Sequence, residues 1–298
     1  MERTIDYIAS YNDTGKTIEK FLKEHSITHQ VMVNLKKTTN GILRNGIWAY
    51  TNEKLDEGDR ISIHIVENDN SANIEPVNIP LDIVYEDEDI IVINKPADMP
   101  VHPSMGNHDN TLANALMYYF NSQKKAFVFR CINRLDRDTT GLTIVAKHAL
   151  SSGILGAAVS SRDIHRTYFA VCSGKTPDFG RIDAPIARKD DSTIERCVDF
   201  HNGEYAVTDY KRLSYNDDKD LSLVQLNLLT GRTHQIRVHM KYIGYPLIGD
   251  FLYNPDYTYM TRQALHSGRL EFKHPVTGKK MNLTSDLPSD MKSLFEFV

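Results

Sequence analysis

Long apolar runs are missing from this sequence of 298 residues. No stretch approaches the roughly 20 consecutive apolar residues that a membrane-spanning helix needs. Residues 1–23 are also too polar for a secretory signal. Neither a membrane protein nor an exported protein is expected, and the sequence predicts a cytoplasmic protein that does not associate with membranes.

Cysteine is scarce, and the common metal-binding patterns are absent. Cys131, Cys172 and Cys197 are far apart and form no Cys-x-x-Cys pair, so neither a disulfide framework nor a thiolate zinc site is indicated. The 12 histidines include no His-Glu-x-x-His pattern, and the spacing of His234 and His239 suits chelation on one helix poorly. We therefore expect reduced thiols and no metal.

An excess of positive charge is missing too. The formal net charge is −4, so the chain is not basic throughout as many nucleic-acid-binding proteins are. A local basic groove remains compatible with this balance, because net charge does not describe its distribution. With 41% hydrophobic and 25% charged residues, the composition is that of an ordinary soluble protein with a core.

Residues 1–68 are predicted to form a small module of their own. Its pattern contains two short helices followed by two strands, over residues 17–22, 31–37, 42–48 and 55–65. Thr14 is the candidate N-cap of the first helix, and Asn45-Gly46 is a tight-turn signal within the first strand. The polar, proline-punctuated residues 69–80 are typical of a linker, which leaves residues 81–298 as the main domain.

The acidic residues 86–89 lie between two β-prone segments, residues 83–85 and 90–93. This arrangement favours a hairpin turn, with carboxylates too crowded and solvated to serve as a catalytic acid pair. Three prolines then stiffen the loop that follows, from which Lys95 and His102 project. A stiff loop loses little entropy when a ligand binds, so these two residues are candidates for ligand contact or for a plain surface turn.

The most informative stretch is Asn133–Gly141, between two β-prone segments at residues 126–132 and 142–146. It places Asp136 and Asp138 among two arginines in a loop. A carboxylate held by guanidinium groups stays charged near neutral pH, as a nucleophile or a base must. Taken alone, the same residues would also suit a solvated polar turn.

Two further segments carry candidate site residues. Residues 166–171 are predicted to be a strand that places Tyr168 and Ala170 on the same face. A strand over residues 221–229 then leads into a helix that Thr233 can cap and that runs to Tyr242 or Ile243. Arg237, one turn into this helix, can reach a carboxylate on a neighbouring loop, which would be either catalytic or structural.

These motifs occur together and in the order typical of one family. They are Ile93-Asn94-Lys95-Pro96, Pro100-Val101-His102-Pro103, Arg134-Leu135-Asp136 with Thr139 and Gly141, Ala146-Lys147, Arg166-Thr167-Tyr168, residues 231–239 (Gly-Arg-Thr-His-Gln-Ile-Arg-Val-His), residues 244–250 with Tyr253, Ala264-Leu265-His266 and His274-Pro275. The chain resembles the RluA-type RNA pseudouridine synthases over most of residues 80–290. It departs from the family at Asn133, where His is usual, at Thr140, where Ser is usual, and at Arg166, where Lys is commoner.

This resemblance implies an α+β fold with a mixed, mostly antiparallel sheet flanked by helices. It implies that Asp136 is the nucleophile, that Arg237 keeps it ionised and that Tyr168 stacks on an everted uracil. The candidates for phosphate contact or loop support are Lys95, Arg134, Lys147 and Arg232. Isomerisation of uridine needs no cofactor, and a monomer acting on a uridine-containing stem-loop of ribosomal or transfer RNA is expected.

The resemblance also extends to the N-terminal module. Its order of elements resembles a small RNA-binding module shared by a ribosomal small-subunit protein and several RNA-modifying enzymes. Lys36, Lys37 and Arg44 would form its phosphate-binding face, or else an ordinary solvated surface.

Two other functions compete with the isomerase. A non-catalytic RNA-binding protein could retain the same fold, although such a protein should have lost at least one of Asp136, Tyr168 and Arg237. A glycoside hydrolase could use Asp136 and Asp138 as its carboxylate pair, although the order of the motifs has no reason to arise there.

Overall fold

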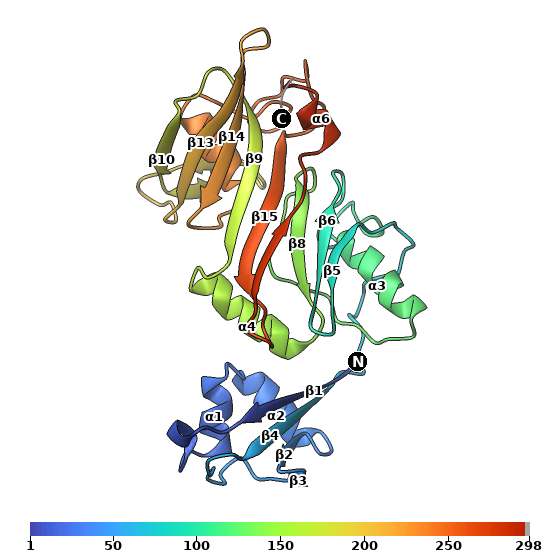
Figure 1. The fold of residues 1–298 in the computed structure, drawn as a ribbon. Coiled ribbons are helices and arrows are strands. Elements are labelled where there is room, and N and C mark those ends of the chain that lie inside the picture. The colour runs from blue at the N-terminus through green and yellow to red at the C-terminus, as the bar shows by residue number, and fades with distance from the viewer. Residues whose placement is uncertain (296–298) are drawn as a thin grey trace.

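The computed structural model describes residues 1–295. Its N-terminal module holds a four-stranded sheet in the order β1-β4-β2-β3. The elements of this module are β1 (Glu2–Ile8), a 3-10 turn (Tyr11–Asp13), α1 (Ile18–Glu24), α2 (His29–Lys37), β2 (Ile42–Arg44), β3 (Ile47–Trp48) and β4 (Arg60–Val66). Figure 1 shows the module below the rest of the chain, next to the helix labelled α4.

The helices of the module begin at threonine caps. The Thr17 hydroxyl accepts a hydrogen bond from the backbone amide of Lys20, and the Thr28 hydroxyl accepts one from Val31. The N-cap of α1 is therefore Thr17, and the prediction of Thr14 is wrong. Both helices bury one apolar face on the sheet, where Phe21 is fully buried.

A ten-stranded mixed sheet forms the centre of the larger region. Its strand order is β10-β13-β14-β9-β15-β8-β6-β5, with β16 paired to β15 and β7 paired to β8. The strands are β5 (Ile83–Glu86), β6 (Ile90–Lys95), β7 (Arg130–Cys131), β8 (Thr140–Ala146), β9 (His165–Ser173), β10 (Phe179–Asp183), β13 (Val207–Asn216), β14 (Leu221–Leu228), β15 (Leu265–Lys273) and β16 (Lys280–Thr284). A separate hairpin is formed by β11 (Ile186–Arg188) and β12 (Arg196–Val198).

Helices cover this sheet on both faces. They are α3 (Leu112–Ser122), α4 (Ala149–Ser160), α5 (Gln235–Tyr242) and the short α6 (Ser289–Lys292). Ile91 and Ile93 of β6 pack in one cluster with α3, whereas their neighbours Ile90 and Val92 pack in another with Leu155 of α4. In the same way, β9 and β14 bury alternate residues against α5 and against α6. The predicted α+β fold with a mixed, mostly antiparallel sheet is confirmed.

The single parallel strand pair among the described residues lies between β8 and β15, where His266 and Ser267 pair with Thr140 and Gly141. Gly141 has a φ of 109°, and a Cβ built on it would lie 2.3 Å from the carbonyl oxygen of Ser267. Only glycine fits at this close approach of β8 to β15. Ser267 is also in register with Tyr168 of β9, so β15 brings the start of β8 beside Tyr168.

Some predicted elements differ from the observed ones. The predicted strand over residues 126–132 is reduced to the two residues of β7, and α5 begins at Gln235 with His234 rather than Thr233 as its N-cap. Residues 69–80 are less detached than a free linker, because Ile74 and Ile79 pack on the cluster beneath α3. None of the helices in residues 1–295 is long and apolar enough to span a bilayer.

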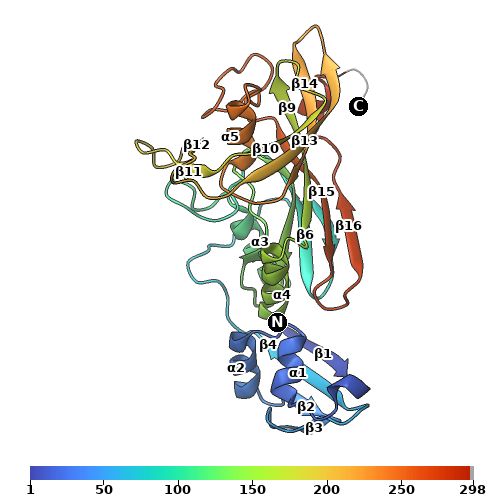
Figure 2. The ribbon, with the colours of Figure 1, turned by 90° about the vertical axis from the view of Figure 1, so that its left-hand side faces the viewer.

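In the edge-on view of Figure 2, the β11–β12 hairpin and α5 project from the same side of the sheet. The segment joining the N-terminal module to the large sheet passes at the lower end of the sheet, where α4 also begins. The two ends of α4 therefore face different surroundings. Leu150 packs in the core of the N-terminal module, and Val159 lines a groove of about 910 Å³.

Candidate active site

Asp136 lies in the loop between β7 and β8, and the side chain of Asn133 fixes the start of that loop. The Asn133 amide nitrogen donates to the Leu142 carbonyl at 3.0 Å, and its oxygen accepts from the Ile144 amide at 2.8 Å. Asn133 is 2% exposed, so both of its polar groups are buried and paired. Asparagine at this position therefore anchors the loop to β8 by two hydrogen bonds.

Lys95 fixes the other side of the same loop. Its Nζ donates to the carbonyl oxygens of Pro96, Met99 and Arg137 at 2.7, 2.8 and 2.8 Å. The three carbonyls match the three hydrogens of an ammonium group. Lys95 is fully buried, and burial lowers its pKa to about 7. The prediction that Lys95 contacts RNA is corrected to loop support, because no part of it can reach a phosphate.

Arg237 pairs with Asp136 and with a second carboxylate. Its Nη1 donates to Asp136 Oδ2 at 2.9 Å, and its Nε and Nη2 donate to the two oxygens of Asp250 at 2.6 Å each. Burial lowers the pKa of Arg237, but its hydrogen bonds and charge interactions with Asp250 and Asp136 outweigh that effect and raise it. A permanently charged guanidinium is thus held rigidly against Asp136.

Tyr168, Asp136 and Arg237 line one small cavity of about 60 Å³. Tyr168 is 4% exposed, and burial raises the pKa of its hydroxyl, so it remains protonated at neutral pH. The structure therefore brings together the three residues named as catalytic from the sequence. It does so with residues from three separate segments: the β7–β8 loop, β9 and α5.

A groove of about 910 Å³ adjoins the small cavity. Asp136 and His234 line both spaces. The arginines around the groove are Arg134, Arg162, Arg166 and Arg232. They give this part of the surface the basic character that the net charge of the whole chain conceals.

Arg134 and Arg232 are exposed at the groove and are placed to meet a phosphate. Arg232 also has protein partners, since its Nη1 lies 2.5 Å from a carboxylate oxygen of Glu204 and its Nε donates to the Tyr205 carbonyl. Lys147, by contrast, is 6% exposed and does not line the groove. It binds Glu86 at 2.8 Å, so the prediction of RNA contact by Lys147 is corrected to structural support.

Asp138 does not accompany Asp136 into the groove. Its carboxylate accepts hydrogen bonds from Arg137, and it lines neither the groove nor the small cavity. Asp138, the carboxylate that a glycoside hydrolase would pair with Asp136, therefore does not face the groove.

Two residues that the sequence did not single out as catalytic belong to this site. Asp250 anchors Arg237, and His234 lies beside Asp136 with its backbone in the left-handed region at φ 58°. His234 lies in the segment where the sequence concentrates donors, but its unusual backbone has no sequence signal because it is not a glycine. Thr233 was expected to occupy the cap position that His234 takes.

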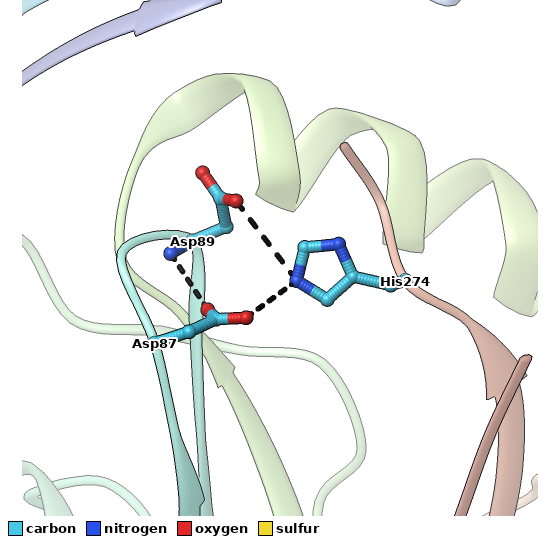
Figure 3. A group of neighbouring side chains, drawn as sticks. All are labelled: Asp87, Asp89 and His274. Carbon is cyan, nitrogen blue, oxygen red and sulfur yellow. Dashed lines mark hydrogen bonds and ion pairs between the residues drawn. The ribbon is translucent and has the colours of Figure 1, made fainter. Parts of the chain in front are cut away.

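Asp87, Asp89 and His274 form the one cluster among the described residues with the spacing of metal ligands (Figure 3). His274 Nε2 lies 2.8 Å from Asp87 Oδ2, and Asp87 Oδ1 accepts the amides of Asp89 and Ile90. Asp89 in turn accepts hydrogen bonds from Arg3 and is paired with His148. The carboxylates are therefore occupied by protein partners, which agrees with the expected turn. The expectation that they are solvated is wrong for Asp89, which is buried.

The charged face expected on the N-terminal module is largely neutralised. Arg44 Nη2 lies 2.5 Å from Asp59 and 2.9 Å from Asp56, and Lys36 lies 3.6 Å from Glu19. Arg44 is thus committed to its own module, and the expectation that it contacts phosphate is not supported by this geometry.

Comparison with known proteins points to one family. The family model described as RNA pseudouridylate synthase matches residues 89–242. A relative described as uncharacterized RNA pseudouridine synthase YjbO, from Bacillus subtilis (strain 168), is 37% identical over 281 residues, which cover 94% of this chain and 98% of the relative. Ribosomal large subunit pseudouridine synthase D of Zymomonas mobilis is 40% identical over 244 residues, covering 76% and 75% of the two chains. Among solved structures, human RNA Pseudouridylate Synthase Domain Containing 1 matches with a TM-score of 0.60 and 26% identity, covering 72% of this chain and 87% of that one.

Proposed function

The chain belongs to the RNA pseudouridine synthase family, and from that premise we propose that it isomerises uridine in large-subunit ribosomal RNA with Asp136 as the nucleophile. The activity follows from the family, and the target follows from relatives named ribosomal large subunit pseudouridine synthase D. The observation that carries the assignment of Asp136 is its pairing with Arg237 beside a groove that Asp136 lines together with four arginines.

The two oxygens of Asp136 have different surroundings. Oδ2 is held by Arg237, whereas Oδ1 has no hydrogen-bond partner among the described residues. Oδ1 is therefore the atom available to attack the nucleoside, at carbon 6 of the base or at the sugar. Arg237 cannot move with the attacking carboxylate, because Asp250 holds it by two hydrogen bonds.

The chemistry conserves atoms and electrons. The bond from N1 of uracil to C1′ of ribose breaks, and a bond from C5 of uracil to the same C1′ forms. C5 loses a proton, and N1 ends with one. The reaction is therefore neither a hydrolysis nor an oxidation, and its stoichiometry calls for no energy-rich co-substrate.

Tyr168 suits the recognition of the base. It lies at the cavity wall with its ring anchored in the core beneath α5, so its orientation is set before RNA binds. A uridine turned out of its helix would stack on this ring, and that contact offsets part of the few kcal/mol that unstacking costs. The exposed Arg134 and Arg232 would hold the flanking phosphates.

These observations support the two competing functions less well than they support the isomerase. A binding protein that had lost catalysis would have no need of Asp136, Arg237 and Tyr168 in one cavity. A glycoside hydrolase would need a second carboxylate facing Asp136, and Asp138 is paired with Arg137 instead. The isomerase accounts for the presence of Asp136, Arg237 and Tyr168 in one cavity.

The test of this proposal is a map of pseudouridine in ribosomal and transfer RNA from cells with and without the gene. We expect one or a few pseudouridines to disappear from large-subunit ribosomal RNA and to return when the wild-type protein is supplied. Unchanged large-subunit RNA together with a lost pseudouridine in transfer RNA would overturn the proposed target while leaving the activity intact.

A further inference from the structure

His234 faces the catalytic carboxylate without being used by the mechanism above. Its side chain is 14% exposed, and its Nε2 lies 3.9 Å from Asp136 Oδ2. It occupies the N-cap of α5 yet makes no capping hydrogen bond with its side chain. A non-glycine residue in the left-handed region costs energy and is often found at functional sites. Here that backbone turns the imidazole toward the groove and the small cavity, both of which it lines.

Tyr253 determines which nitrogen of His234 carries the proton. The Tyr253 hydroxyl oxygen accepts a hydrogen bond from the backbone amide of Arg196 at 2.9 Å and lies 3.0 Å from His234 Nδ1. Among the described residues, Nδ1 is the one acceptor within reach of the hydroxyl hydrogen. Because buried hydroxyl groups are rarely left without an acceptor, Tyr253 donates to Nδ1. The proton of the neutral imidazole is therefore on Nε2.

The charges around His234 leave it neutral near pH 7. Burial lowers its pKa, and the positive charges of Arg237 on α5 and Arg196 on β12 act in the same direction. The carboxylates of Asp136 and Asp250 oppose this shift, but the net effect is downward. Burial also raises the pKa of Tyr253 to about 12, so its hydroxyl keeps its hydrogen. Nε2–H is therefore a neutral donor that points toward the site.

We propose that His234 is a further catalytic residue, which donates its Nε2–H to a carbonyl oxygen of the everted uracil. This inference rests on the proposed function. At 3.9 Å the N–H is too far from Asp136 for a hydrogen bond, and Arg237 already occupies the nearer oxygen. Breaking the bond between N1 and C1′ leaves negative charge on the uracil, much of it on the carbonyl oxygens. A fixed N–H donor beside that charge stabilises the transition state more than the ground state.

A pair of substitutions separates this role from a structural one. His234→Gln retains an amide N–H near the position of Nε2, whereas His234→Phe retains the ring and removes both nitrogens. Both variants keep a non-glycine residue at the same strained position, so their backbone cost is matched. The measurement is the single-turnover rate at saturating enzyme, with the dissociation constant for the same RNA and the thermal midpoint of each protein.

We expect His234→Phe to lower the single-turnover rate by about 100-fold, the size of effect seen when one transition-state donor is removed. RNA affinity should change by less than about threefold, and His234→Gln should recover most of the rate. A rate for His234→Phe within about threefold of wild type, or equal losses in the two variants, would overturn the proposal. Because wild-type turnover of the same RNA is the reference, an inactive wild type would count against the proposed function and not against His234.

The tautomer gives a test that does not depend on activity. Nitrogen-15 NMR of the histidine side chains, with His234 assigned from the His234→Gln protein, should show a protonated Nε2 and an unprotonated Nδ1 at pH 7.5. The opposite tautomer, or a doubly protonated ring, would contradict the geometry on which the inference stands.

Discussion

Arg237 holds two carboxylates at once, and this single residue explains much of the site. It is 1% exposed, so its charge is kept from water and balanced by Asp136 and Asp250. Three of its nitrogens are committed to those acids, which fixes Asp136 without covering its second oxygen. A site built in this way is rigid before the substrate arrives, and that favours catalysis over mere binding.

Lys95 is the most informative residue for a test of pH dependence. Its pKa falls from 10.5 in the unfolded chain to about 7 in the folded protein. Between these values the unfolded chain binds a proton here that the folded protein does not, so Lys95 makes the free energy of unfolding rise with pH. We expect Lys95→Met to be less stable by about 1–3 kcal/mol, because it leaves three carbonyls without a donor. The deficit should grow as pH is raised from 7 to 10.

Urea unfolding of both proteins at pH 7, 8.5 and 10 measures this difference. Lys211→Met, on the exposed side of β13, is the control and should change stability by less than about 0.5 kcal/mol at every pH. If the free energies of unfolding of wild type and Lys95→Met changed with pH in parallel, the lysine would not titrate between pH 7 and 10.

For individual residues, the sequence predicted which side chains belong to the site better than it predicted what each of them does. Asp136, Arg237 and Tyr168 follow from motif order, and all three meet in one cavity. Lys95 and Lys147 were misjudged because a lysine beside a loop is usually exposed, and only the fold shows that both are buried. The role proposed for His234 was missed because it depends on a backbone angle and on a tyrosine 19 residues away.

Among the elements, β15 is the one that assembles the site. It pairs in parallel with β8 and in antiparallel fashion with β9, so Ser267 stands between Gly141 and Tyr168. The loop that carries Asp136 leads directly into β8, and the strand pairing therefore sets the separation of Asp136 and Tyr168. Long-range pairing of this kind cannot be inferred from local periodicity.

Gly141→Ala tests the close contact between β8 and β15. A Cβ at residue 141 would lie 2.3 Å from the Ser267 carbonyl oxygen and 2.7 Å from its nitrogen, at a φ of 109°. We expect a loss of about 3 kcal/mol or more in the free energy of unfolding, because backbone atoms on both strands must move. Gly278→Ala is the control, since residue 278 has a φ of 68° and a Cβ added there would meet no described atom within 4 Å.

For Gly278→Ala the free energy of unfolding should fall by only about 1 kcal/mol, which is the cost of the left-handed backbone alone. Chemical denaturation of the two variants makes the comparison. Equal losses would mean that the approach of β8 to β15 is looser than the structure shows.

Local patterns did predict several elements. The strand expected over residues 166–171 lies within β9, and the strand expected over 221–229 is β14. The elements that local patterns did not predict are those stabilised by partners distant in the sequence, such as the paired strands β15 and β16 and the β11–β12 hairpin. Residues 126–132 are apolar and β-prone, but Phe127 and Phe129 pack under α3 instead of extending the ladder.

For the molecule as a whole, the N-terminal module is attached by specific contacts and not only by the chain. Arg3 of β1 makes two hydrogen bonds to Asp89, and Glu67 pairs with Arg130 at 2.9 Å. Leu150 of α4 is buried in the core of the module. The cluster in Figure 3 thus lies at the boundary between the module and the large sheet, which explains its buried charges.

Arg3→Met should loosen this attachment. Asp89 is 2% exposed and would lose its guanidinium partner, leaving a buried carboxylate with only the histidines His148 and His274 beside it. We expect proteolytic cleavage within residues 69–82 to become about tenfold faster, as expected for a contact worth about 1.4 kcal/mol or more. Arg60→Met breaks a pair with Asp6 whose side chains are 60% and 37% exposed, and it should leave the cleavage rate nearly unchanged. Equal rates for Arg3→Met and wild type would mean that the module does not depend on this contact.

The most direct test of the whole account compares Asp136→Asn with Asp138→Asn in the conversion of uridine to pseudouridine, using ribosomal RNA from cells that lack the gene. Both variants replace an aspartate of the same loop by its amide, but only Asp136 meets Arg237 at the groove. We predict that Asp136→Asn forms no pseudouridine while remaining folded and able to bind RNA, and that Asp138→Asn converts its target at a rate close to that of wild type. Conversion by Asp136→Asn at the wild-type rate would contradict the account.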